Sequence, residues 1–230
     1  QNAMDAITAK RYKTDFQSEI RVSYFQHEQG DGLIVQDNGI GLTAEEAEAF
    51  LSRIGASSKS LDSIEETRSD FIGQFGIGLL SCFMVSDEIV VLTRAYGQEE
   101  GGKWVGKIDG SYHSEAAEVD FQGTRVVLKL RPSANLTPDK MANLLRMYGA
   151  YLKVPIAYER DENFQENIQK TFPWEGANQG NHEVALGFGM EQFGISFSHY
   201  IPLRDASGET VGMAYIMPRA SHQGEEAGHR

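Results

Sequence analysis

The chain has 230 residues, of which 40% are hydrophobic and 10% aromatic, enough for one full domain and part of a second. Its 33 acidic and 21 basic residues give a net charge of −12, which makes it a poor candidate for binding a nucleic-acid backbone. No apolar run approaches the ~20 residues that span a bilayer, and the single cysteine excludes an internal disulfide. We therefore expect a cytoplasmic protein with no nucleic-acid partner and no membrane partner.

The first third of the chain predicts helices and strands in alternation. We expect a helix over 1–11, strands over 19–26 and 32–37 joined as a hairpin, a helix over 43–54, and an irregular or partly helical segment over 55–72. Thr43 followed three residues later by Glu46 forms a capping box, which marks a helix start. The first residue is not Met and already falls in a predicted helix, so we expect the natural chain to begin upstream of Gln1.

The remaining sequence predicts most of a sheet and a second domain. We expect a helix over 79–86, strands over 88–95, 103–109, 114–121 and 123–130, a helix over 136–152 and a closing strand over 154–159. Thr137 and Pro138 suit the cap and first position of the later helix. From Glu159 onward the composition becomes polar, which predicts a domain over 1–160, a linker over 161–192 and a second domain starting at 193.

A strand-end carboxylate followed by two glycines marks the segment 37–41, DNGIG. Asn-Gly by itself favours a tight hairpin turn. The residues after Gly41 predict a helix rather than a second strand, which argues against a hairpin. Asp37 in this place can instead accept a hydrogen bond from the exocyclic amine of a purine, with Gly39 and Gly41 letting the backbone approach the ring.

Three further patterns have both a structural and a ligand-binding interpretation. The segment 73–78, GQFGIG, leads into a helix, so it is either a loop with helix-capping glycines or a phosphate site of free backbone N–H groups. Asn2 can offer a neutral oxygen to Mg²⁺ with Asp5 one turn further on, although an exposed amphipathic helix end explains both residues. Thr124 opens a strand and is either a site residue or only a β-former.

Taken in order, these motifs resemble one protein family. QNAMDA, DNGIGL, SSK, GQFGIGLLSCFMVSDEIVVLTR and GTRVVLKL are similar to motifs of the N-terminal nucleotide domain of the ninety-kilodalton heat-shock chaperones, which belong to the GHKL superfamily with DNA gyrase, MutL repair proteins and histidine kinases. The resemblance covers about residues 1–160 and returns at GMAYIMPR, which resembles the start of the family's middle domain. It implies a two-layer α/β sandwich, the Bergerat or GHKL ATP-binding fold, with a mixed, mainly antiparallel sheet and helices on one face.

The resemblance also implies roles for individual residues. Asp37 would accept the adenine amino group, Thr124 would support it through a bonded water, and Asn2 would coordinate Mg²⁺. Residues 55–78 would form a mobile lid that carries Lys59 toward the phosphates. The other residues implied in binding ATP or ADP are Asp5 on the first helix, Gly41 and Leu42 at the base, and Gly76, Ile77, Gly78 and Leu79 at the phosphates.

The implied function is ATP binding and slow hydrolysis that drive conformational cycling of a protein-folding chaperone. Client proteins would be its partners, and a C-terminal region beyond this chain would form a homodimer. The family's catalytic Glu falls four residues before Asn2, upstream of Gln1, so no catalytic residue is assigned within the chain. The family's second lid lysine falls near Gly55, and its middle-domain arginine lies beyond Arg230. We therefore expect this chain to bind Mg²⁺–ATP and to hydrolyse it weakly.

Two alternatives remain. One is the ATPase region of a DNA-acting GHKL protein, a topoisomerase or a MutL-like protein, against which the acidic balance argues. The other is a nucleotide-sensing module without turnover. A dimerising C-terminal domain in the full-length reading frame would support the chaperone, and a toprim or DNA-binding segment would contradict it.

Overall fold

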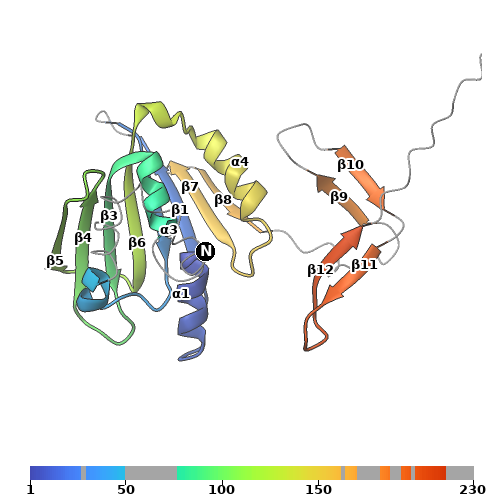
Figure 1. Cartoon of the computed structure of the whole chain (residues 1–230), viewed down its shortest axis with the longest axis horizontal. Helices are drawn as coiled ribbons and strands as arrows, with labels where there is room; N and C mark the ends of the chain where they lie inside the picture. The colour runs from blue at the N-terminus through green and yellow to red at the C-terminus, as the bar shows by residue number, and fades with distance from the viewer. Residues whose placement is uncertain are drawn as a thin grey trace, which may run out of the picture. The chain divides into compact units, whose positions relative to one another are not determined.

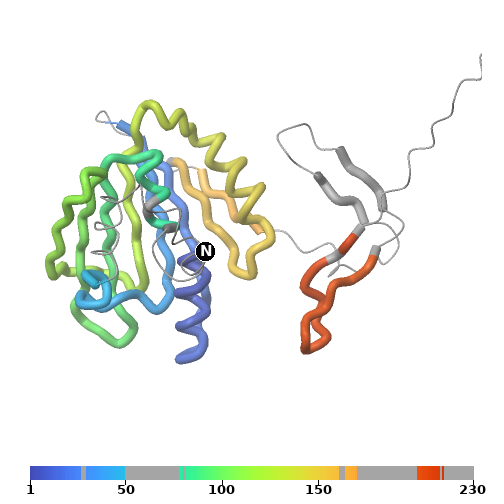
Figure 2. The backbone as a smooth tube through the Cα atoms, viewed as in Figure 1, coloured from blue at the N-terminus to red at the C-terminus, as the bar shows by residue number. Residues whose placement is uncertain are grey.

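The computed structural model describes residues 1–26, 30–49, 77–161, 164–169, 182–186, 193–197 and 200–215. The chain divides into two units, Gln1–Gln169 and Lys170–Arg230. The course of the backbone through the first unit can be followed in Figure 2. The first unit holds the described helices and one large sheet, and the second holds two separate β-hairpins.

Eight strands form the sheet of the first unit. They are β1 (Ile20–Phe25), β2 (Gly32–Asp37), β3 (Ser86–Arg94), β4 (Gly101–Lys107), β5 (Tyr112–Ala117), β6 (Gly123–Leu130), β7 (Ile156–Asp161) and β8 (Phe164–Ile168). Their order across the sheet is β5-β4-β3-β6-β2-β1-β7-β8 (Figure 1). β1 and β7 are parallel, and the other neighbouring pairs are antiparallel. This arrangement confirms the expected mixed, mainly antiparallel sheet, and β1 and β2 form the expected hairpin.

The alternation of side chains along the strands gives the sheet one covered face. In β1, Ile20, Val22 and Tyr24 are buried, whereas the residues between them are more exposed. The covering elements are α1 (Asn2–Arg11), α3 (Ile77–Leu80), the 3₁₀ turn η2 (Ser81–Met84) and α4 (Pro138–Tyr148). Figure 1 shows α1, α3 and α4 in front of the strands. The two-layer α/β sandwich is therefore confirmed.

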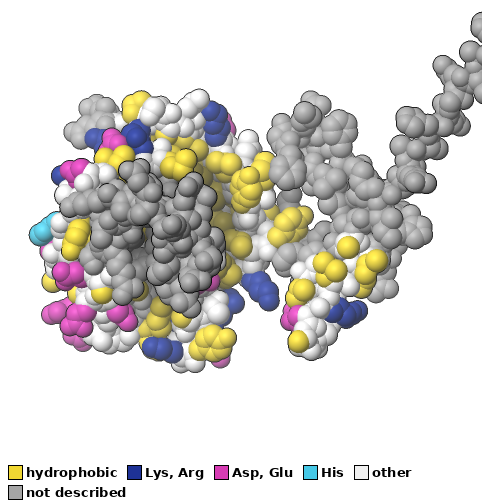
Figure 3. Space-filling model, in the orientation of Figure 1, with side chains coloured by type: hydrophobic (Ala, Val, Ile, Leu, Met, Phe, Trp, Pro, Cys, Tyr) yellow, Lys and Arg dark blue, Asp and Glu magenta, His cyan; other side chains and the backbone are white. Residues whose placement is uncertain are grey.

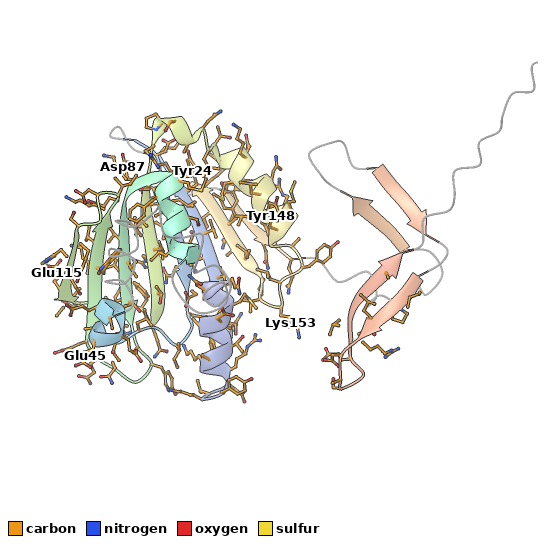
Figure 4. The ribbon with its side chains drawn as sticks, in the orientation of Figure 1. Tyr24, Glu45, Asp87, Glu115, Tyr148 and Lys153 are labelled. Atoms are coloured by element: carbon orange, nitrogen blue, oxygen red, sulfur yellow. The ribbon has the colours of Figure 1, made fainter. Side chains whose placement is uncertain are left out.

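Two buried tyrosines fasten α4 to the sheet. The Tyr24 hydroxyl, labelled in Figure 4, lies 2.6 Å from Asp31 Oδ2 and 2.9 Å from the carbonyl oxygen of Leu136. The Tyr158 hydroxyl donates to the carbonyl oxygen of Pro138 at 2.7 Å. Thr137 Oγ1 accepts from the backbone N–H of Lys140, which confirms the predicted cap of this helix. The start of α4 is thus held by two tyrosine hydroxyls that bind backbone carbonyl oxygens and by the side-chain cap of Thr137.

Several predicted boundaries differ from the structure. The capping box is formed, since Thr43 N donates to Glu46 Oε2 and Glu46 N donates to Thr43 Oγ1, and 44–49 are helical as predicted, whereas 50–54 of the predicted helix 43–54 lie outside the described residues. The apolar run predicted as a helix over 79–86 is α3 followed by η2, and β3 begins at Ser86. Pairing with Leu130 of β6 draws Ser86 into the sheet, so at this end of the predicted helix a tertiary contact overrides the local preference.

The polar stretch assigned to a linker over 161–192 contains strands. β8 pairs with β7, and Arg146 of α4 holds Glu166 of β8 in an ion pair of 2.5 Å, so the first unit extends to Gln169. β8 is the last strand of the sheet, and its side chains alternate between a more buried and an exposed face, with the polar Gln165 and Asn167 exposed. The second unit pairs β9 (His182–Leu186) with β10 (Phe193–Phe197) and β11 (Tyr200–Arg204) with β12 (Thr210–Tyr215).

The surface of the first unit is mixed in character, as Figure 3 shows. On α4, Leu144, Met147 and Tyr148 are exposed apolar side chains, and Tyr148 is 73% exposed. Among the residues that the structure describes, no helix is long and apolar enough to cross a membrane.

Candidate functional site

Three polar residues form one row across the middle of the sheet. Asp37 ends β2 and lies opposite Thr124 of β6, which in turn lies opposite Thr93 of β3. Their side chains share the helix-covered face, where Asp37 is 7% and Thr93 is 1% exposed. The carboxylate of Asp37 and the hydroxyls of Thr124 and Thr93 therefore lie side by side on the sheet face that the helices cover.

The Asp37 carboxylate is held in an environment that opposes its charge. Burial raises its pKa to about 6, while the backbone N–H groups of Gly39 and Thr124 and the ammonium of Lys10 act in the opposite direction. The N–H of Gly39 donates to Asp37 Oδ1 at 2.9 Å. A buried carboxylate with a raised pKa, next to hydroxyls, is a typical feature of a binding site.

The segment after Asp37 is a closely packed connection to a helix and not a hairpin turn. Asn38 is held on both sides of its amide, since Nδ2 donates to Gln17 O at 2.8 Å and Oδ1 accepts from Glu19 N at 2.9 Å. Gly39 packs so closely that a Cβ there would lie 2.6 Å from the carbonyl carbon of Ala6 and 2.8 Å from Asp37 Oδ1. A hairpin at DNGIG would pair β2 with the segment that follows it directly, but the two neighbours of β2 are β1 and β6, and 44–49 are helical. The hairpin interpretation of DNGIG is therefore wrong.

Gly41 and Leu42 join this segment to the end of β3. Gly41 has φ +66, and a Cβ there would lie 2.1 Å from the carbonyl oxygen of Arg94, so only glycine fits. The N–H of Leu42 donates to Thr93 Oγ1 at 2.9 Å. Thr93 Oγ1 also lies 3.1 Å from the carbonyl oxygen of Gly123 and 3.2 Å from Thr124 Oγ1. Through these bonds Thr93 connects Leu42, which is expected near the adenine base, with Thr124 of β6.

The start of α1 meets the start of α3. Asn2 is the first residue of α1, and a Cβ on Gly78 would lie 3.7 Å from Asn2 Nδ2 and 3.8 Å from Asn2 Oδ1. Asp5 is exposed on α1, whereas Leu79 is 7% exposed and packs into the core. Ile77 begins α3. Gly76 and Lys59, with most of the predicted lid over 55–78, lie outside the described residues.

The structure adds two residues that the sequence analysis missed. Thr93 is a strand threonine, and its role depends on the pairing of β3 with β6, which no local pattern announces. Lys10 is a helix lysine that is 6% exposed and donates to the carbonyl oxygen of Asn38 at 2.8 Å. The one available signal was its position three residues after Ile7, on the apolar face of the predicted helix.

We expect Thr93→Val to destabilise the first unit by about 1–3 kcal/mol, because the isosteric side chain leaves the Leu42 N–H without its acceptor in a buried place. Chemical denaturation followed by circular dichroism measures the change. Thr8→Val is the control, because Thr8 Oγ1 donates to the carbonyl oxygen of Met4 at an exposed site of α1. Equal losses for the two variants would contradict the proposed junction at Thr93.

Comparison with known proteins agrees with this geometry. Residues 1–134 match the family described as histidine kinase-, DNA gyrase B-, and HSP90-like ATPase. The chain is 33% identical over 199 residues to the chaperone protein HtpG of Bordetella avium, covering 78% of this chain and 31% of that protein. It is 31% identical over 186 residues to HtpG of Orientia tsutsugamushi, covering 74% of this chain and 29% of that protein.

The matches cover the site as well as the fold. The family match spans α1, the row of Asp37, Thr124 and Thr93, and α3. The chain itself spans about a third of the length of the curated relatives that it matches. The chain belongs to the histidine kinase-, DNA gyrase B- and HSP90-like ATPase family, and its similarity to HtpG places it in the HSP90-like branch.

Proposed function

We propose that this chain is the ATP-binding region of an HSP90-like chaperone and that Asp37 recognises the adenine base. The observation that carries the proposal is the buried Asp37 carboxylate in one row with Thr124 and Thr93. A carboxylate accepts a hydrogen bond from the adenine amino group, and a charge-assisted bond of this kind is strong where water is excluded. The glycines at 39 and 41 let the segment after Asp37 pack directly against Ala6 of α1 and Arg94 of β3, which fixes the place of the carboxylate.

The phosphates are assigned to the meeting point of α1 and α3. Asn2 and Gly78 lie together there, and Asp5 and Gly78 are exposed, so a charged group can reach them from solvent. Mg²⁺ keeps several waters and needs only one or two protein oxygens beside phosphates, so the single side-chain oxygen of Asn2 fits it. When bound, the ion would neutralise phosphate charge. The backbone N–H groups of Gly76, Ile77, Gly78 and Leu79 are proposed to hold the phosphates, with Lys59 from the lid.

The wider activity rests on the relatives. Proteins named as HtpG chaperones match the chain, which favours the chaperone over a DNA-acting ATPase. Slow ATP hydrolysis, action on client proteins, a homodimer and a cytoplasmic location are proposed for the whole protein. The start of a middle domain is proposed for residues from 193 onward. The general base for hydrolysis is assigned to none of the described residues.

The proposal predicts base selectivity that a calorimetric titration can measure. ADP should bind at least about tenfold more tightly than GDP, because the 6-oxo group of guanine would place an acceptor against the Asp37 carboxylate. Mg²⁺ should strengthen ATP binding in the wild type and less so in Asn2→Ala. Equal affinity for ADP and GDP would remove Asp37 from base recognition, and an unchanged Mg²⁺ effect in Asn2→Ala would remove Asn2 from the metal site.

A further inference from the structure

A buried lysine faces the turn that follows the adenine-recognising carboxylate. Lys10 lies one turn after Ile7 on the inner face of α1, and both side chains are buried. Its Nζ donates to the carbonyl oxygen of Asn38 at 2.8 Å. The same Nζ lies 4.3 Å from the centre of the Phe16 ring and 5.9 Å from that of Tyr96. The ammonium group is thus enclosed by a carbonyl and two aromatic faces.

A lysine in such a place costs free energy unless its surroundings favour the charge. Burial lowers the pKa of Lys10, and the negative charge of Asp37 raises it. Conversely, the Lys10 ammonium lowers the pKa of Asp37 against the effect of burial. Asn38 directly follows Asp37 in the chain, so Lys10 binds the backbone next to the carboxylate and stabilises its charge.

We propose that Lys10 is a positioning residue for nucleotide binding, which fixes the turn at Asn38 and keeps the Asp37 carboxylate ionised to accept the adenine amino group. This inference rests on the proposed role of Asp37. Lys10 would touch neither the base nor the phosphates, because its ammonium group is already engaged with the carbonyl oxygen of Asn38. Its effect would reach the ligand through the charge and the orientation of the carboxylate.

The groups around Asp37 make a pH test specific. From α1 the charged group that acts on Asp37 is Lys10. The segment after β3 presents the ring of Tyr96 to the Lys10 ammonium and not to the carboxylate. From β6 and β3 the row presents the hydroxyls of Thr124 and Thr93, which do not titrate in the range concerned. A change in the pH dependence of binding after substitution of Lys10 therefore reports the carboxylate.

The experiment is a calorimetric titration of ADP into the 230-residue chain between about pH 5.5 and 8.5. Lys10→Gln removes the charge but keeps a donor for the Asn38 carbonyl, so it should raise the midpoint of the affinity profile by about one pH unit, giving about fivefold weaker binding than wild type near pH 6 and equal binding at the alkaline end. Lys10→Met also removes the bond to Asn38, so it should show the same shift of the midpoint together with a loss of affinity at every pH. Lys10→Arg keeps the charge and should retain the wild-type midpoint.

The control is Lys140→Met. Lys140 Nζ donates to the carbonyl oxygen of Asn135 at 2.8 Å, the same kind of bond at an exposed site, so its removal should leave the profile unchanged. Comparing variants at the same pH cancels the protonation of ADP itself. A midpoint that stays at the wild-type value in both Lys10→Met and Lys10→Gln overturns the proposal, because a purely structural role would weaken binding equally at every pH.

A second measurement needs no nucleotide. The free energy of unfolding is measured against pH for Lys10→Met, Asp37→Asn and the double variant. In the acid range where Asp37 titrates, the Lys10 substitution should alter the pH dependence only where Asp37 is present. If Asp37→Asn binds ADP as wild type does, Asp37 does not recognise adenine. The unfolding measurements would still decide whether Lys10 stabilises the ionised form of Asp37. If the neutral variants do not fold, the ¹³C titration of the wild-type Asp37 carboxyl must show a second step when Lys10 deprotonates, and a single step overturns the proposal.

Discussion

Asp37→Asn should lose at least about tenfold in affinity for ADP and ATP, because it would remove the proposed charge-assisted hydrogen bond to the adenine amino group, which would be worth about 1.5–3 kcal/mol. The amide keeps the shape of the side chain and an oxygen for the Gly39 N–H, so the turn is retained. Its NH₂ group would meet the adenine amino group as a second donor. Calorimetric titration at pH 7.5 measures the loss.

The same substitution should not weaken the fold. The pKa of Asp37 is about 6 in the folded protein and 3.8 as an ordinary value, so between these values the folded state holds a proton that the unfolded state releases. The free energy of unfolding therefore falls as pH rises from about 4 to 6, and Asp37 contributes about 3 kcal/mol to this fall. Asp37→Asn should remove that fall and be at least as stable as wild type at pH 7.5.

The exposed acid Asp120 supplies the control for both results. Asp120→Asn changes the net charge by the same amount at the surface, so it should alter neither the ADP affinity nor the pH dependence of unfolding. Wild-type affinity in Asp37→Asn would exclude the adenine role. Unfolding profiles that fall equally in Asp37→Asn and wild type would show that another group causes the decline.

Gly41→Ala should destabilise the first unit by about 3 kcal/mol and weaken nucleotide binding. A left-handed φ costs a non-glycine residue about 1–2 kcal/mol. Here φ is +66, and the new Cβ would also lie 2.1 Å from Arg94 O and 2.7 Å from Arg94 C. Backbone atoms cannot rotate away as a side chain does, so the segment at Gly41 must move away from β3. Overpacking of this kind costs about 1–3 kcal/mol in addition to the strain in φ.

Gly97→Ala separates the two causes. Gly97 has φ +79, and a Cβ there would meet nothing within 4 Å, so this variant carries the backbone strain without the clash. Chemical denaturation should give Gly97→Ala a loss of about 1 kcal/mol, smaller than that of Gly41→Ala. Equal losses would mean that the contact with Arg94 has no consequence and that the segment after Gly39 can shift freely.

Much of the framework is encoded in short stretches of sequence. The apolar run of β2 and the alternation in β1 predict two strands with a turn between them, and the capping box of Thr43 and Glu46 predicts a helix start. These signals succeed because they depend on neighbours within four residues. β8 was missed because its exposed alternate residues are polar and it is short, so its sequence resembles a linker, and only its pairing with β7 shows that it is a strand.

The sequence by itself determined the order of the motifs, and through them the family, the fold class and the residues assigned to the base and phosphates. The tertiary structure alone decided the parts of the site that depend on contacts between distant segments. Thr93 acquires its role only when β3 pairs with β6, and Lys10 is buried only because α1 lies against the turn at Asn38. A helix lysine is normally solvated, so its burial follows from the packing of one element on another, a property that no local pattern contains.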